Sequence, residues 1–402
     1  MRFQIIYILF VAHFFINPCF SQDNELLSVV ERSLDRATKL SIEMAKSLEN
    51  DTLLPRSYKN NKLVTSDAHW WCSGFFPGVL WYLYEHNPND ELKCYAQNYT
   101  ERIRKEQFTT DNHDVGFMIY CSFGNGSRLL GLEDYKKVVL QASKSLSTRY
   151  DKKIGMIRSW DFNEKDWQYP VIIDNMMNLE MLMWASKEFN NAEFRRIAIN
   201  HADKTLKEHF RPDYSCCHLV DFDTITGKSR IKQTVQGYAD ESSWARGQGW
   251  ALYGYTMMFR ETGMMKYLKH AEGIAHFILN HPNLPKDKIP YWDFNDPGIP
   301  NIWRDASAAA VIASALIELS QLTGDKKLSK KCIETAIVQI KTLSSSEYLA
   351  EPGTNGNFIL KHSVGHLPAN SEIDVPLTYA DYYYVEALMR YKKLAGSLSV
   401  KH

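Results

Sequence analysis

Apolar residues recur along this chain at the three- and four-residue spacing of amphipathic helices, and few segments show the alternation typical of strands. The predicted helices span residues 25–48, 72–86, 91–107, 114–130, 133–149, 171–188, 191–209, 242–261, 264–280, 303–322, 325–344 and 376–394. Turn-forming sequences such as Asn87-Pro88-Asn89 and Pro352-Gly353 separate them. No linker rich in Ser, Gly or Pro interrupts the series, so residues 22–402 are predicted to form one domain.

The even-numbered predicted helices differ in composition from the odd-numbered ones. Helix 242–261 carries Gly247 and Gly249, and helix 303–322 contains a run of alanines, whereas helix 191–209 is amphipathic with a charged outer face. Small residues allow helices to approach closely, which suits an inner ring sheathed by an outer one. The pattern therefore predicts an all-α fold, an (α/α)6 barrel of six inner and six outer helices. A helical-repeat solenoid is the alternative, but no fixed sequence period supports it.

The first residues have the pattern of an export signal. One Arg is followed by an apolar run that is too short for a membrane span, and Cys19-Phe20-Ser21 resembles a small-residue cleavage site. Residues 1–21 are therefore predicted to be a signal peptide that leads to a secreted, periplasmic protein. Lipid anchoring at Cys19 is the alternative, but the preceding Ile16-Asn17-Pro18 is a poor lipidation context. No later segment is predicted to span a membrane.

Composition narrows the classes of partner. Lys plus Arg number 47, as do Asp plus Glu, so the formal net charge is zero and a nucleic-acid partner is not expected. Aromatic residues make up 13% of the chain, which suits sugar-binding clefts but also large helical cores. The six cysteines beyond the signal segment lack zinc-ligand spacing and are predicted to be mostly buried thiols. Neither a metal nor a cofactor is predicted.

Unusual polar and aromatic residues gather at the starts of the even-numbered helices. They are His69, Trp70 and Trp71; Asn112, His113 and Asp114; Asp174 and Asn175; Trp244, Arg246, Gln248 and Trp250; and Arg304 and Asp305. If the inner helices run parallel, these starts converge at one end of the barrel. Helix N-termini carry partial positive charge and free N–H groups, which favour carboxylates and anionic ligands. We therefore predict one polar, aromatic pit that contains Asp114 and Asp174.

Each of these residues also has a purely structural interpretation. Asp114 and Asp174 could be helix N-caps, although Asp174 follows an apolar run where an unpaired charge is costly. His113 beside Asp114 could suggest a metal pair, but no matching ligand spacing follows. Arg246 and Trp250 lie one helical turn apart and could be a cation–π pair in the core or part of an anionic-sugar site. Two further aspartates, Asp305 and Asp374, are interpreted as structural caps or anchors.

Several motifs that together run from about residue 70 to 390 resemble the unsaturated glucuronyl hydrolases, glycoside hydrolase family 88. The stretches are WWCSGFFPGVLW, DNHDVGFM, YPVIIDNMMNLEMLMWAS, DESSWARGQGWALYGY, RDASAAAVIASALIEL and SEIDVPLTYADYYYVEAL. They stand in the order found in that family. The unsaturated rhamnogalacturonyl hydrolases, which share the fold and the two-aspartate arrangement, are a weaker match.

The resemblance implies a reaction and a set of site residues. The substrate would carry a nonreducing-end uronic acid with a C4=C5 double bond, the product of a polysaccharide lyase, and no cofactor would be needed. Asp174 would be the general acid/base and Asp114 its companion carboxylate, kept ionised. The uronate subsite would comprise His218, Thr234, Gln236, Arg246 and Trp250. His113 is a further substrate-binding candidate, and Trp71 and Trp160 are candidate stacking walls.

Alternatives for function remain at this stage. An ordinary inverting glycosidase on the same barrel is one, and a secreted glycan-binding protein without catalysis is another. The segment KHSVGHLPANSEIDVP, before the last helix, offers His362, Ser363, His366 and Asn370 where the resemblance places recognition of the leaving sugar. It leaves chondroitin, hyaluronan, heparin and ulvan fragments open as substrates, and the oligomeric state unknown.

Overall fold

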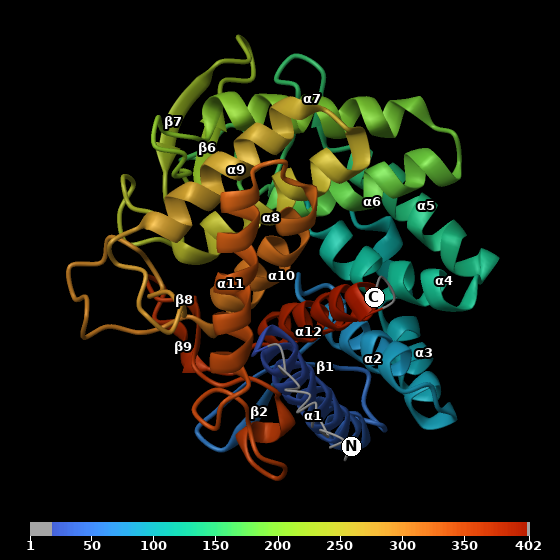
Figure 1. The fold of residues 1–402 in the computed structure, drawn as a ribbon. Helices are drawn as coiled ribbons and strands as arrows, with labels where there is room; N and C mark the ends of the chain where they lie inside the picture. The colour runs from blue at the N-terminus through green and yellow to red at the C-terminus, as the bar shows by residue number, and fades with distance from the viewer. Residues whose placement is uncertain (1–17, 400–402) are drawn as a thin grey trace, which may run out of the picture.

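A closed ring of six helical segments forms the centre of the molecule in the computed structural model, which describes residues 18–399 (Figure 1). The ring consists of α2 (Phe75–His86), the π-helix η2 (Gly116–Gly124) continued by α4 (Asn125–Leu130), α6 (Asn175–Glu188), α8 (Ala245–Thr262), α10 (Ala306–Leu322) and α12 (Thr378–Ser399). Each segment contacts the next, and α12 closes the ring against α2.

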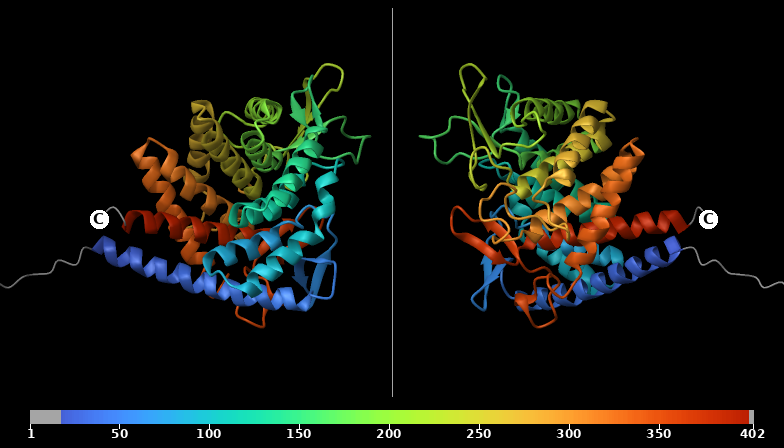
Figure 2. Two further views of the ribbon diagram at one scale, coloured as in Figure 1. Left: turned by 90° about the vertical axis from the view of Figure 1, so that its right-hand side faces the viewer. Right: turned by 60° about the vertical axis from the view of Figure 1, so that its left-hand side comes forward.

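A second set of six helices surrounds this ring. It consists of α1 (Pro18–Ser47), α3 (Asp90–Arg102), α5 (Glu133–Ser147), α7 (Ala192–Glu208), α9 (Met265–Asn280) and α11 (Lys326–Leu343). Helices α3, α5, α7, α9 and α11 each pack on the inner segment that precedes them in the chain, and α1 packs along α12, as both views of Figure 2 show. The predicted (α/α)6 barrel, with even-numbered helices inside, is confirmed.

The burial of side chains follows the composition of the two rings. In the inner helix α10 every residue from Ala306 to Ile317 is buried, whereas the outer helix α11 buries only the stripe that begins with Leu328 and Cys332. Small residues make the close packing possible: a Cβ added at Gly116 would lie 2.6 Å from Oδ1 of Asn178 on the neighbouring inner helix. The alternation of helix composition along the sequence thus reflects two environments: burial on all sides in the inner ring and on one side in the outer ring.

Short strands in the connections were not anticipated from the sequence. Within residues 18–399 there are four small antiparallel sheets. They are built from β1 (Leu54–Lys59) and β2 (Lys62–Ser66), β3 (Tyr150–Asp151) and β4 (Met156–Ile157), β5 (Pro170–Ile172), β6 (Leu219–Phe222) and β7 (Ser229–Gln233), and β8 (Ser363–His366) and β9 (Ser371–Val375). Strands this short carry too few residues for period-two alternation to stand out.

Some predicted boundaries are wrong in ways that matter for the site. Residues 170–172 belong to β5, so α6 begins at Asn175 and not at residue 171. The predicted helix 114–130 begins as the π-helix η2. The sequence also did not predict the two short 3-10 helices, η1 (Arg104–Phe108) and η3 (Asn355–Asn357). Helix α1 starts at Pro18, inside the predicted signal peptide, most of which lies outside the described residues.

The cysteine prediction is confirmed with one exception. The six cysteines beyond the predicted signal segment are free thiols; five are buried and Cys94 is exposed. As for membranes, none of the helices in the described part of the chain combines the length and apolarity that a transmembrane span needs.

Candidate active site

The connections that enter the inner helices bring the predicted site residues to one end of the barrel. Asp114 precedes η2, Asp174 precedes α6, and Arg246 lies in the first turn of α8. In the left view of Figure 2 the β1–β2 hairpin lies at one side of the barrel and the end of α12, marked C, at the other. Contacts between these starts, such as Trp71 with Phe117 and Arg246 with Tyr379, show that the expected convergence of helix N-termini is present.

Asp174 lies at the junction between a strand and an inner helix. It occupies the N-cap position of α6, yet its side chain makes no capping hydrogen bond. The side chain is 10% exposed, and Oδ2 has no hydrogen-bond partner among residues 18–399. The capping interpretation is therefore wrong for Asp174. A buried carboxylate oxygen left unpaired is costly, and such a cost is typical of functional sites.

His218 directs its ring toward Asp174. The backbone N–H of Ile173 donates to the carbonyl of His218 (2.9 Å), which holds the start of β6 beside the end of β5. Nδ1 of the ring accepts the backbone N–H of Val235 (2.9 Å). Burial lowers the pKa of His218 to about 3, so the ring is neutral and carries its proton on Nε2. That atom lies 3.6 Å from Oδ2 of Asp174.

Asp114 stands in the turn before η2, with a histidine of its own. Oδ1 of Asn112 accepts the backbone N–H of Asp114 (2.9 Å). Oδ1 of Asp114 lies 3.4 Å from Nε2 of His113, which is buried. Burial, with a smaller effect of the charge on Arg149, holds the pKa of His113 well below its usual range. The two carboxylates thus each face a neutral imidazole.

Asp114 and Asp174 are electrostatically coupled. Burial raises the pKa of Asp114 to about 8, and the charge of Asp174 adds to the rise. Burial also raises the pKa of Asp174, to about 7, while the positive charge of Arg246 opposes the increase. Both pKa values lie well above the ordinary value of an aspartate, so the pair resists the loss of its last proton. Coupled carboxyls of this kind share one proton near neutral pH.

Several aromatic rings at this end of the barrel pack against one another. The ring centroid of Trp71 lies 5.6 Å from that of Phe117 and 4.9 Å from that of Tyr379. Trp250 packs on the other side of Phe117, at 5.4 Å. The buried Tyr379 hydroxyl makes no hydrogen bond within the described chain. These rings combine apolar faces with a free polar atom, as sugar-binding sites do.

Arg246 is buried and engaged with protein groups. Its guanidinium donates to the carbonyl oxygens of Val364 (2.6 Å) and Gly365 (2.7 Å) and forms an ion pair with Asp305 (3.1 Å). It also donates to Oε1 of Gln236 (3.0 Å). The structural interpretation of Asp305 is confirmed, since it caps α10 by accepting the backbone N–H of Ser307. The assignment of Arg246 to the uronate subsite stays a prediction.

The remaining predicted residues lie around the same pit. Thr234 follows β7, and its hydroxyl accepts the backbone N–H of Gly237 (2.7 Å). Trp160 forms a β-bridge with Asn112, which places it beside the turn that carries Asp114. Its ring stacks on Phe162 at 4.9 Å. Asp374 does not cap a helix but pairs with His362 on the rim, at 2.7 Å.

Two residues near the carboxylates were not among the site residues predicted from the sequence. Tyr379 lies in the first turn of α12, so the rule that selected the other helix starts would have found it. Ser159, behind His113, lies in a connection that has no periodicity to mark it. As for metal ions, no group of three or more His, Cys, Asp or Glu side chains in the described part of the chain is arranged to hold one.

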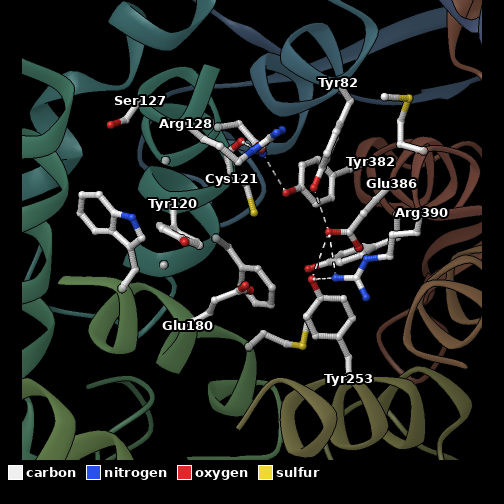
Figure 3. Close-up of a pocket in the computed structure, with 18 of the residues that line it drawn as sticks. Tyr82, Tyr120, Cys121, Ser127, Arg128, Glu180, Tyr253, Tyr382, Glu386 and Arg390 are labelled. Atoms are coloured by element: carbon white, nitrogen blue, oxygen red, sulfur yellow. Dashed lines mark hydrogen bonds and ion pairs between the residues drawn. The ribbon is translucent and has the colours of Figure 1, made fainter. Parts of the chain in front are cut away.

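A separate cavity of about 530 Å³ lies at the opposite end of the barrel (Figure 3). Its lining comes mostly from the later turns of inner helices and includes Tyr82, Glu180, Glu386 and Arg390. It also reaches Gly116, Phe117 and Met177, in the first turns of η2 and α6. The polar groups have protein partners: Glu386 accepts hydrogen bonds from the hydroxyls of Tyr82 (2.9 Å) and Tyr253 (3.0 Å). Within the described chain, none of the predicted site residues lines this cavity, so the candidate active site is the N-terminal mouth.

Comparison with known proteins places the chain among enzymes. The family model described as Glycosyl Hydrolase Family 88 matches residues 45–393. An unsaturated glucuronyl hydrolase of Formosa agariphila is 48% identical over 81% of this chain and 80% of its own. An unsaturated chondroitin disaccharide hydrolase of Streptococcus pyogenes is 32% identical over 83% of this chain and 84% of its own.

Solved structures show the same similarity. An unsaturated glucuronyl hydrolase described as specific for heparin superposes with a TM-score of 0.88 at 48% identity, over 91% of this chain and 98% of its own. The enzyme from Bacillus sp. GL1, described as responsible for the degradation of glycosaminoglycan, gives a TM-score of 0.82 at 30% identity, over 89% and 96%. From the family match and these two levels of similarity it follows that the chain belongs to glycosyl hydrolase family 88.

Proposed function

We propose that this enzyme removes the nonreducing-end 4,5-unsaturated uronic acid from oligosaccharides that polysaccharide lyases produce. The observation that carries the proposal is the pair of carboxylates at the mouth of the barrel, the partly buried Asp114 and the buried Asp174, each facing a neutral imidazole. The relative from Formosa agariphila, at 48% identity, is an unsaturated glucuronyl hydrolase, which supports the same reaction here.

The carboxylate pair is suited to protonating a vinyl ether. The raised pKa values of Asp114 and Asp174 leave one proton on the pair near neutral pH. We assign its delivery to Asp174, which donates the proton to C4 of the unsaturated uronate. The electron pair of the double bond forms the new C4–H bond, and positive charge develops at C5 and the ring oxygen. The ionised Asp114 stabilises this charge.

Water completes the reaction. Asp174, now ionised, accepts a proton from a water molecule as the water oxygen bonds to C5. The resulting hemiketal opens, and the bond to the remaining saccharide breaks during its rearrangement. The glycosidic carbon is not attacked, so the carboxylate separations that distinguish retaining from inverting glycosidases do not apply. Asp174 ends the cycle protonated, as it began.

Unpartnered polar atoms around the pair support a polyhydroxylated ligand. The indole nitrogen of Trp160 and the hydroxyl of Tyr379 are buried and have no hydrogen-bond partner in the described chain. Hydrogen bonds with sugar hydroxyls and the uronate carboxylate would satisfy them. We place the sugar ring among these residues, with Trp71 and Trp160 as walls and with His113, His218, Thr234 and Gln236 at the uronate end.

For the source polysaccharide we favour heparin-type chains. A structural neighbour at 48% identity is described as specific for heparin, whereas the chondroitin disaccharide hydrolase of Streptococcus pyogenes is 32% identical. Unsaturated disaccharides from chondroitin, hyaluronan and ulvan are the competing substrates, and the assay below compares all four.

The test is a continuous assay of the ultraviolet absorbance of the C4=C5 bond. Purified enzyme is mixed with unsaturated disaccharides from heparin, chondroitin, hyaluronan and ulvan, and kcat/KM is measured for each. The proposal expects the absorbance to disappear, fastest with a heparin disaccharide. Asp174→Asn should bind substrate but lower kcat by about 10²- to 10⁴-fold. No loss of absorbance with any substrate would refute the reaction, and wild-type turnover by Asp174→Asn would refute the assigned role.

We also infer export through the N-terminal segment, with the mature protein in the periplasm. The support is the apolar run and the small-residue site near Ser21. N-terminal sequencing of the protein from cell fractions tests this inference: a free N-terminus near residue 22 in the periplasmic fraction is expected. A lipid-modified Cys19 in the membrane fraction would instead identify an anchored protein.

A further inference from the structure

Ser159 lies fully buried behind the carboxylate pair, in the connection between β4 and β5. Its carbonyl accepts the backbone N–H of His113 (2.9 Å), and its N–H donates to the carbonyl of Pro170 (2.9 Å). The backbone of Ser159 is thus tied on one side to the turn that carries Asp114 and on the other to β5, which leads to Asp174. The side chain of Ser159 cannot move from this position unless these two backbone hydrogen bonds break.

The direction of each hydrogen bond at the Ser159 hydroxyl follows from its partners. Oγ accepts the backbone N–H of Ile172 (3.0 Å), which can only donate. The single hydroxyl proton is therefore free for another acceptor. Nδ1 of His113, at 3.3 Å, is the acceptor that lies within reach in the described chain. Oγ has a second lone pair, so a protonated Nδ1 could also donate to it, but the buried hydroxyl proton would then have no acceptor, which is costly. The tautomer that satisfies every group has an unprotonated Nδ1 that accepts the Ser159 hydroxyl.

The consequence appears on the other side of the ring. A neutral imidazole has one proton, and with Nδ1 acting as acceptor that proton sits on Nε2. His113 is 1% exposed, and Nε2 lies 3.4 Å from Oδ1 of Asp114. The partial positive charge of an N–H group at this distance favours the ionised form of the carboxylate. The hydroxyl of Ser159 therefore acts on Asp114 through the ring of His113.

His218 provides an internal comparison. Its Nδ1 accepts the backbone N–H of Val235 (2.9 Å), so its proton also sits on Nε2, the atom that faces Asp174. At both histidines a hydrogen bond accepted by Nδ1 therefore keeps the proton on Nε2, the atom that faces the carboxylate. At His218 the tautomer is set by a backbone amide, which only a proline substitution would remove, whereas at His113 it is set by a side-chain hydroxyl.

We propose that Ser159 is a positioning residue of the reaction: it holds the proton of His113 on Nε2 and so sustains the ionised form of Asp114. The proposal rests on the proposed function of the carboxylate pair. Without the hydroxyl, His113 can carry its proton on Nδ1 and turn the lone pair of Nε2 toward Asp114. The carboxylate would then lose a donor and face a partial negative charge, which favours its protonated form.

Other ionisable groups also face this part of the site, from each neighbouring element. Asp174 acts on Asp114 from the start of α6, and Arg149 acts from the end of α5. The rings of His201 on α7 and His218 before β6 act on His113. Substituting Ser159 leaves all of them in place, so a change in the titration of the pair can be traced to the tautomer of His113.

The test combines kinetics with a direct observation of the tautomer. In Ser159→Ala, kcat for the disaccharide that the wild type turns over best is expected to fall about tenfold, the effect of a change of about one unit in the pKa of Asp114, with KM within about twofold. The alkaline limb of the kcat profile should move to higher pH, because the pair keeps its proton more tightly. Nitrogen-15 NMR of histidine-labelled wild type should show His113 protonated on Nε2.

Two variants separate positioning from simple loss of packing. Ser143 is also a fully buried serine, and its hydroxyl bonds the carbonyl of Val139 within α5 (2.9 Å). Ser143→Ala should leave the pH profile unchanged. Ser159→Thr keeps the hydroxyl and is expected to restore the wild-type position of the alkaline limb, even where the added methyl lowers stability.

Three results would overturn the inference. One is a His113 ring protonated on Nδ1 in the wild type, an observation that needs no variant to fold. Another is a Ser159→Ala enzyme with wild-type kcat and an unmoved limb. The third is an equal loss of rate at every pH, which a merely structural role would give. If the wild type turned over no substrate, the proposed function would fail, while the NMR result would still decide the tautomer.

Discussion

Replacing Asp174 by Asn is expected to stabilise the folded enzyme at alkaline pH even though it removes the proposed proton donor. Asp174 is 7% exposed, and its Oδ2 has no hydrogen-bond partner in the part of the chain that the structure describes. Folding therefore moves an ionised carboxylate from water into a site whose hydrogen bonds do not fully replace its hydration, which costs free energy. An amide of nearly the same shape carries no charge, so it avoids this cost.

The magnitude follows from the titration of Asp174. Burial raises its pKa from 3.8 to about 7, a change that corresponds to about 4 kcal/mol. Below pH 4 the carboxyl is protonated in both the folded and the unfolded chain, and there is no penalty. Between about pH 4 and 7 the unfolded chain loses the proton first, so the free energy of unfolding falls as pH rises. Above pH 7 the penalty is complete.

The expected gain is smaller than this difference because the Asn amide is itself a buried polar group. Allowing about 1–3 kcal/mol for its incomplete hydrogen bonding, Asp174→Asn should be more stable than the wild type by about 1–3 kcal/mol at pH 8 and no more stable near pH 4. Urea unfolding followed by tryptophan fluorescence at both pH values measures the difference.

A matched control is Asp305→Asn. Asp305 is also buried, but it pairs with Arg246 and caps α10, so the substitution should destabilise the enzyme at both pH values. The reasoning would be refuted if Asp174→Asn were no more stable than the wild type at pH 8, or if its gain were equally large near pH 4.

Other expected results follow from the same contacts. The value of kcat/KM should fall as pH rises above about 8, because the carboxyl pair then loses its shared proton; a pH profile with no alkaline limb would contradict this. Gly116→Ala should lower the free energy of unfolding by about 1–3 kcal/mol, since the added Cβ would lie 2.6 Å from Asn178. Unchanged urea unfolding would show that η2 and α6 can move apart to make room for the methyl group. Arg246→Met leaves the buried Asp305 carboxylate unpaired and removes two ties to the β8–β9 hairpin. It should cost about 3–5 kcal/mol and speed hydrogen exchange over residues 363–375; unchanged exchange there would contradict the anchoring role. Incubation with EDTA should leave the rate unchanged, and a loss that added metal restores would show that the prediction of no metal is wrong.

The barrel and the approximate place of its active site follow from the sequence alone. Inner helices are apolar and small all round, and outer helices carry one apolar stripe, because burial on all sides and burial on one side select different residues. With six such pairs the connections enter the inner helices from one end. Asp114 and Asp174, sixty residues apart, could therefore be placed in one pit before any coordinates.

The protonation chemistry of that pit depends on the tertiary structure. The neighbour that opposes the rise in pKa at Asp174 is Arg246, which lies on a different helix and is itself anchored by the β8–β9 hairpin. The tautomer of His113 depends on Ser159, in a connection without any sequence pattern. Such effects arise from contacts and charges between segments far apart in the chain. Helix periodicity indicates which side of a helix is buried, but it does not predict which polar atoms of different segments come into contact.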